Sequence, residues 1–147
     1  MARSVIGVIV GYLLMFALEF AAFMTIYTVV GADWSFKPGS YYASTRWTLM
    51  QFTVAFVIAV IGGWICALIS KGGKAPLVLA IVIVVIGFTL GALHVATQPA
   101  DTGEVRGPNV PNLVAMTKTR QPAWVFFLGP VLGAVGAIAG GKLKRRA

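Results

Sequence analysis

The chain has 147 residues, of which 59% are hydrophobic and 11% are charged, whereas about 25% of the residues in a typical soluble domain are charged. This composition excludes a soluble globular domain, a disordered tail and a disulfide-based scaffold, and it indicates a small integral membrane protein. The formal net charge is +8. Because the basic residues stand at the ends of apolar runs, we expect them to contact anionic lipid headgroups, and we expect no nucleic-acid partner.

Four apolar runs are long enough to cross a bilayer, which takes about 20 residues in a helix. They cover about residues 5–30, 47–69, 76–97 and 123–141. Helices are expected because lipid offers no partners to free backbone polar groups, and the runs lack the alternation of barrel strands. The predicted fold class is therefore all-α: one membrane-embedded bundle of four transmembrane helices. The last run contains Pro130 and closes on Gly140-Gly141, which are expected to end it.

The distribution of basic residues predicts the orientation of the bundle. One side carries seven of them, namely Arg3, Lys71, Lys74, Lys142, Lys144, Arg145 and Arg146. The other side carries five, Lys37, Arg46, Arg106, Lys118 and Arg120, together with Asp33, Asp101 and Glu104. We therefore expect both termini in the cytoplasm, and a bacterial inner membrane as the location. The first run is longer than the apolar core of a signal peptide and is expected to remain in the protein.

Two long outer loops, 31–46 and 98–122, contrast with a tight cytoplasmic turn at 70–75. Ser44 or its successor is expected to cap the second helix, because a hydroxyl there accepts from a free amide of the first turn. Within the second loop, a short surface helix is expected over 113–119.

A faint internal repeat relates the second and fourth helices. Aligning Arg46 with Arg120 also aligns Gly62 with Gly136. The pattern is consistent with two duplicated helical hairpins in parallel orientation, and equally with chance similarity between apolar segments.

Small residues four positions apart are the clearest pattern in the apolar runs. The second helix has Ala55, Ala59, Gly63 and Ala67, and the fourth has Gly129 and Gly133, then Gly136 and Gly140. In lipid, such spacing lets helix backbones approach closely. The pattern predicts helix packing, either within this bundle or against a partner helix.

An acid inside the first helix is the sharpest single feature. Glu19 lies near the helix centre, where an acid costs about 2.5–3.5 kcal/mol on insertion scales. Tyr12 falls on nearly the same face, seven residues earlier, and Thr89 is expected at a similar depth. Three interpretations are open: a protonated acid in a structural hydrogen bond, a proton- or cation-linked site, and a contact with a partner subunit.

His94 lies about one turn from the outer end of the third helix, with Gln51 expected near its level. A hydrogen-bonded packing role is expected for it, and ligation of a haem or chlorin is the alternative. The expected depths of His94 and Glu19 differ by about 7–8 Å at 1.5 Å per residue. Together, the candidate intramembrane polar site consists of Glu19, Tyr12, Thr89, His94 and Gln51.

The sequence lacks the groupings that carry most enzyme chemistry. Its single cysteine, Cys66, cannot form an internal disulfide or a redox dithiol. One histidine and four scattered acids do not predict a metal cluster. No nucleophile elbow, zinc-protease or phosphate-loop motif occurs. We therefore expect no enzyme activity, no cofactor and no metal.

Two resemblances bear on function. Glu19 in the first helix of a small four-helix protein resembles the small multidrug resistance transporters, but those proteins have short loops on both sides, so the chain is not assigned to them. The segment 61–70, with Gln121-Pro-Ala-Trp124 and Gly140-Gly141-Lys142, is similar to uncharacterised four-helix bacterial membrane proteins. That resemblance implies no activity.

The functional hypothesis is a non-enzymatic membrane protein that acts as an accessory or self-associating subunit. Its expected partners are membrane lipid and either other membrane subunits or itself. The alternative hypothesis is a small proton-linked transporter or channel that uses Glu19. The two hypotheses differ in one observable. A transporter needs a hydrated cavity at Glu19, whereas a packing subunit needs Glu19 to be hydrogen-bonded and closed off from water.

Overall fold

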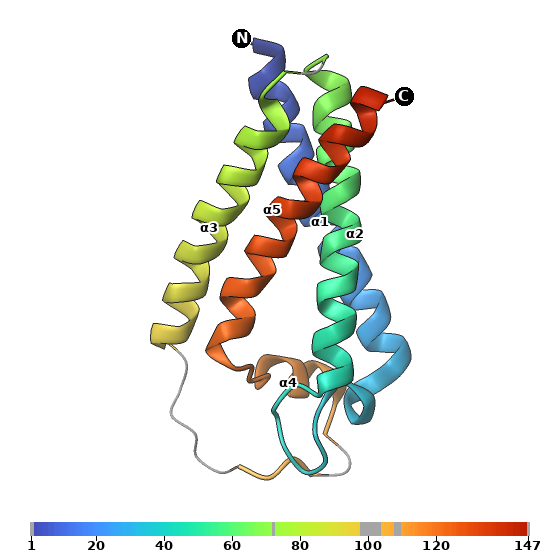
Figure 1. Ribbon diagram of the computed structural model, residues 1–147. Coiled ribbons are helices and arrows are strands. Elements are labelled where there is room, and N and C mark those ends of the chain that lie inside the picture. Colours follow the sequence, from blue (N-terminus) through green and yellow to red (C-terminus); the bar gives the residue numbers. More distant parts are fainter. Residues whose placement is uncertain (1, 72, 98–103, 108–109, 147) are drawn as a thin grey trace.

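A computed structural model describes residues 2–71, 73–97, 104–107 and 110–146 and places four long helices in one bundle (Figure 1). The long helices are α1 (Ala2–Ser35), α2 (Thr45–Ile69), α3 (Ala75–Thr97) and α5 (Ala123–Arg146), and a short helix, α4 (Asn112–Thr117), precedes the last. Each long helix is apolar enough and long enough to span a membrane. The predicted all-α bundle is confirmed, and the chain is an integral membrane protein.

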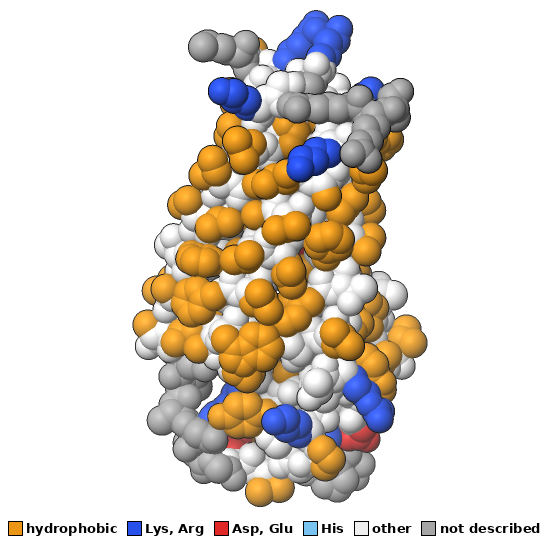
Figure 2. Space-filling view, viewed as in Figure 1, with side chains coloured by type: hydrophobic (Ala, Val, Ile, Leu, Met, Phe, Trp, Pro, Cys, Tyr) orange, Lys and Arg blue, Asp and Glu red, His pale blue; other side chains and the backbone are white. Residues whose placement is uncertain are grey.

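The helices run alternately along the bundle. Both termini and the turn between α2 and α3 lie at one end, here called the terminal end, and the two long loops lie at the other, the loop end (Figure 1). On the face shown in Figure 2, hydrophobic side chains cover the middle of the bundle and basic side chains stand at both ends. This arrangement matches a bilayer core between two headgroup layers.

Glycine contacts hold α2 and α5 together. A Cβ at Gly63 would lie 2.1 Å from the carbonyl oxygen of Ala137, and one at Gly140 would lie 2.0 Å from that of Val60. Because real Cβ atoms do not come so close, only glycine permits this backbone approach. The α3–α5 contact uses the same device, since Gly87 leaves room for the ring of Pro130.

Two helices are longer than the sequence predicted. Helix α5 continues to Arg146 instead of ending near residue 141. The prediction failed because Gly140 and Gly141 serve close packing against Val60 and Pro76, and neither ends the helix. The basic residues that follow are favourable at a helix C-terminus. Helix α1 extends to Ser35 across a break at Gly31, whose φ of 73° requires glycine.

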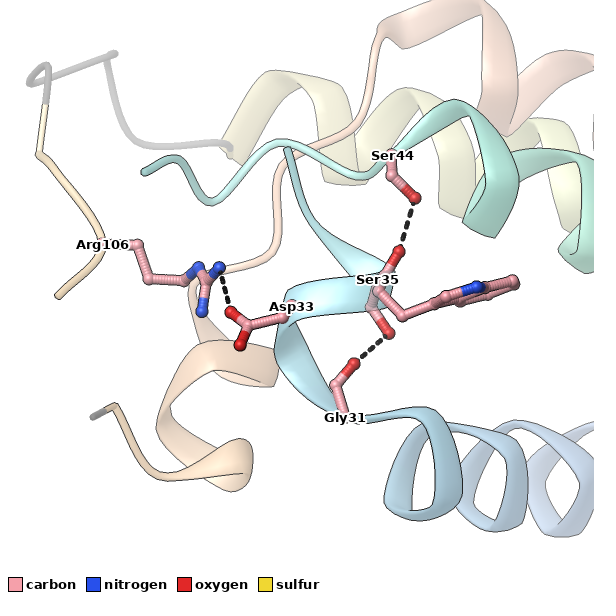
Figure 3. Close-up of polar contacts among 6 residues, drawn as sticks. Gly31, Asp33, Ser35, Ser44 and Arg106 are labelled. Atoms are coloured by element: carbon pink, nitrogen blue, oxygen red, sulfur yellow. Dashed lines mark hydrogen bonds and ion pairs between the residues drawn. The ribbon is translucent and has the colours of Figure 1, made fainter. Parts of the chain in front are cut away.

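The break at Gly31 turns the chain into the first loop (Figure 3). The hydroxyl of Ser35 donates to the carbonyl of Gly31 at 2.8 Å. The hydroxyl of Ser44 donates to the carbonyl of Trp34 at 2.8 Å and accepts from the amide of Trp47 at 3.1 Å. Ser44 therefore caps α2 and fixes the start of that helix to the end of α1.

The described parts of both loops form a folded cap, defined here as residues 32–44, 104–107 and 110–121. Tyr42 and Arg120 pair in a parallel bridge, so the segments that lead into α2 and α5 lie side by side. Tyr27 of α1 packs with Phe36 and Tyr41 of the cap in a buried aromatic cluster. Helix α4 covers Asn112–Thr117, where the sequence predicted 113–119.

Charged groups also tie the cap together. The side chain of Arg106 is 7% exposed and donates to the carboxylate of Asp33 at 2.7 Å (Figure 3). Its guanidinium lies 5.9 Å from the ring centre of Phe36. At the surface, Lys118 donates a hydrogen bond to Glu104, and this bond raises the pKa of the Lys118 ammonium.

Candidate intramembrane site

A cavity of about 260 Å³ is lined by all four long helices, and it opens to the surface of the bundle beside the exposed side chains of Phe16 and Leu90. Among the described residues, no Cα atom of α1 comes within 8 Å of one in α5. The cavity lies between these two helices, with α2 and α3 on its flanks. Its walls are mainly apolar, and its polar side chains are Tyr12, Glu19 and Gln51.

Helix α1 presents one face to the cavity. Tyr12, Met15, Phe16, Glu19 and Phe23 all line it, and their spacing of three, one, three and four residues places them on one side of a helix. Glu19 is half-buried. Within the described part of the chain its carboxyl group makes no hydrogen bond or ion pair, and the residue lines the cavity.

Glycines on the opposite wall create the space. A Cβ added at Gly129 would meet no atom within 4 Å, which shows that this part of α5 faces the open cavity. Gly133 and Gly87 also line it, on α5 and α3. A side chain at Gly129 would extend into this open space, whereas one at Gly87 would meet the ring of Pro130.

A second cavity, of about 210 Å³, adjoins the first under the cap. Its lining includes Ser35, Thr119 and Gln121, and it shares Phe23 and Gln51 with the Glu19 cavity. The side-chain amide of Gln121 donates to the side-chain carbonyl of Gln51 at 3.1 Å. The carbonyl oxygen of Gln121 is itself buried without a partner among the described residues. Gln51 therefore lines the same cavity as Glu19 and is also hydrogen-bonded to Gln121 of the cap.

Two of the candidate polar residues lie outside this site. Thr89 is exposed, and its hydroxyl donates to the carbonyl of Val85 on its own helix at 2.8 Å. His94 is also exposed and lies one turn beyond Leu90, the last α3 residue in the lining. Its ring centre lies 4.6 Å from that of Phe126. The structure thus brings together Tyr12, Glu19 and Gln51, and leaves Thr89 and His94 apart.

The small-residue positions divide between packing and cavity. Ala59, Ala67, Gly63, Gly136 and Gly140 are buried in helix contacts. Ala55, Gly129 and Gly133 instead line the Glu19 cavity. The same spacing therefore serves two purposes along α2 and α5.

Sequence reasoning missed the aromatic surroundings of Glu19 and the polar link to the cap. Phe16, Phe23, Phe52 and Phe126 all line the cavity, but phenylalanine is common throughout the apolar runs. Gln121 lies 70 residues from Gln51 in sequence. Its position next to a predicted helix start was the only signal that could have connected the two.

The chemistry open to this cavity is that of one carboxyl group in an apolar, aromatic setting. No group of three or more His, Cys, Asp or Glu side chains comes together in the described ranges. A lone carboxyl can take up and release a proton, or pair with a cation. Comparison with protein-family models, with curated proteins and with solved structures found no match to this chain.

Proposed function

We propose that this membrane protein is non-enzymatic and is a small proton-linked transporter or channel whose binding group is Glu19. One observation carries the proposal: Glu19 lines a cavity, and its carboxyl group makes no hydrogen bond to a described residue. An acid at this depth costs about 2.5–3.5 kcal/mol on insertion scales. A purely structural acid would offset that cost with a hydrogen bond. A proton- or cation-binding acid needs the free space that surrounds Glu19.

The cavity is large enough to hold water beside the acid. Its volume is about 260 Å³, and one water occupies about 30 Å³ in the liquid. Several waters could therefore connect Glu19 with Tyr12 and Gln51. The adjoining cavity extends this polar route to the cap, so we propose that protons or cations reach Glu19 from the loop end.

The charge distribution supports an orientation for this route. The terminal end carries seven basic residues and no acid, which favours the cytoplasmic side. We therefore propose a bacterial inner membrane, with both termini in the cytoplasm and the cap outside. The route from the cap to Glu19 then starts on the outer side.

Proton flux through the purified protein tests the proposal. The protein is reconstituted in vesicles that contain a pH-sensitive dye, and a potassium gradient with valinomycin drives protons inward. The expected result is faster acidification than in protein-free vesicles. The proposal is contradicted if flux, at both signs of the potential and with lipophilic or inorganic cations added, equals that of protein-free vesicles.

Replacing Gln51 by Leu is expected to slow this flux by a factor of about two to ten. The variant removes one hydrogen-bonding group from the route, a loss of about 0.5–1.5 kcal/mol for a neutral pair. Thr53→Val is the matched control, because Thr53 lies on the same helix but is exposed and bonds to its own helix at Leu49. Equal flux in Gln51→Leu and Thr53→Val would show that the route does not pass Gln51.

A second proposal is an accessory or self-associating subunit. Its supporting observation is that α1 is the least buried of the four spans. Only 17% of the most apolar part of α1 is buried within the bundle, against 28–33% in the other three spans. The exposed face of α1 carries Ala17, Ala21 and Thr25, small residues four apart that suit helix association. The mass of the protein extracted in mild detergent tests this: an assembly with itself or with other membrane proteins supports it, and a monomer contradicts it.

A further inference from the structure

A groove at the terminal end is lined by aliphatic side chains and has a lysine at its opening. It has a volume of about 300 Å³ and lies between α1 and α3. Its lining residues are Ser4, Val5, Val8, Ile9, Lys74, Ala75 and Val78. The two polar side chains, Ser4 and Lys74, stand next to the helix ends, and the aliphatic side chains continue toward the middle of the bundle.

Lys74 also borders a second groove on the other side of α3. This groove has a volume of about 220 Å³, and Lys142 of α5 contributes a second ammonium group to it. Lys74 and Lys142 are both exposed. Lys74 therefore stands between two hollows, and both place aliphatic side chains beside a lysine.

No acidic side chain of the sequence stands at this end beside the seven basic residues. Both ion pairs found among the described residues, Arg106–Asp33 and Lys118–Glu104, belong to the cap. Glu19 lies in the middle part of α1, Asp33 lies at the loop end of α1, and the other two acids of the sequence belong to the second long loop. Helix α3 begins at Ala75, so its positive end adds to the potential around Lys74.

We propose that this end binds one anionic phospholipid, with its phosphate at Lys74 and an acyl chain in the groove between α1 and α3. Two features favour a lipid over other anions. A free phosphate would use Lys74 and leave the aliphatic groove empty. A zwitterionic lipid would use the groove but gain less from Lys74 and Lys142. This site is separate from the Glu19 cavity and does not depend on the proposed transport.

Lipid retention by the purified protein tests the proposal. The full chain in mild detergent is incubated with phosphatidylglycerol or phosphatidylcholine of the same chain length, and bound lipid is counted by native mass spectrometry. We expect phosphatidylglycerol to be retained preferentially. Lys74→Gln should lower its retention about fivefold, the factor expected for one basic group at an anionic headgroup. Retention of phosphatidylcholine should not change.

Two matched controls separate a built site from general surface charge. Lys71→Gln removes a charge from the same turn at a residue that lines neither groove. Val78→Phe fills the groove, whereas Ile81→Phe adds the same bulk at an exposed position of α3 outside the lining. We expect Val78→Phe to weaken retention and the other two variants to leave it near the wild-type level.

Three results would overturn the proposal. The first is an equal loss in Lys71→Gln and Lys74→Gln, which would indicate unspecific attraction to the surface. The second is equal retention of the two lipids by the wild-type protein. The third is complete displacement of phosphatidylglycerol by inorganic phosphate at equal concentration, which would identify an anion site without a role for the groove.

Discussion

Replacing Glu19 by Gln is expected to reduce proton flux to the rate of protein-free vesicles while the protein stays folded. The amide has nearly the same shape as the carboxylic acid but cannot take up a proton. The cavity around residue 19 should keep its volume, because Tyr12 and Gln51 are untouched. Vesicle acidification measures the flux, and thermal unfolding in detergent measures stability. The unfolding temperature is expected to stay equal or rise, since an amide costs less than an acid inside a membrane.

Two further variants complete this test. Glu104→Gln removes an exposed acid that pairs with Lys118 in the cap, and it should leave flux unchanged. Glu19→Asp keeps a titratable group and should retain part of the flux. Wild-type flux in Glu19→Gln would refute the transport proposal. A lower unfolding temperature in that variant would instead indicate a structural acid.

Replacing Gly140 by Ala is expected to be the most destabilising small change in the bundle. The added Cβ would lie 2.0 Å from the carbonyl oxygen of Val60 and 2.8 Å from the amide nitrogen of Trp64. Both are backbone atoms of α2, so the two helices must separate. Overpacking costs about 1–3 kcal/mol, which exceeds the gain of up to about 1 kcal/mol from the higher helix propensity of alanine. The midpoint of thermal unfolding in detergent measures the loss.

The same helix provides a matched control for this prediction. At Gly129 an added Cβ meets nothing within 4 Å, so Gly129→Ala should be neutral or slightly stabilising. Gly63→Ala should behave like Gly140→Ala, because its Cβ would meet the backbone of Ala137. If Gly129→Ala and Gly140→Ala changed the midpoint by the same amount, the close α2–α5 contact at Gly140 would not be the cause of the loss.

The fold was predictable because lipid leaves few choices. Apolar length alone located four helices, and α2 ends at the predicted Ile69, as α3 does at the predicted Thr97. The end of α5 was wrong because glycine has two uses in membrane helices. It ends a helix when the chain must turn, and it continues one when another backbone lies close. Only the position of Val60, which the sequence does not give, decides between them.

The sequence predicted how deep the candidate residues lie in the membrane, but not which face of each helix points toward the cavity. Counting residues placed Thr89 near the level of Glu19, yet level does not specify which side of α3 faces the cavity. Tyr12 and Glu19 share a helix, so their spacing of seven fixed a common face without knowledge of α3. The face of α3 that meets the cavity is set by its contact with α5, where Gly87 receives Pro130.

The close contact of α2 with α5 limits how this molecule can change shape. These helices touch backbone to backbone near the terminal end, and the parallel bridge between Tyr42 and Arg120 joins their starts at the loop end. The two helices are joined at both ends, and we expect them to move as one rigid unit. Because α3 is also held against α5 at Gly87 and Pro130, we expect any change in the volume around Glu19 to come from tilting of α1, which makes no close backbone contact with α5 among the described residues.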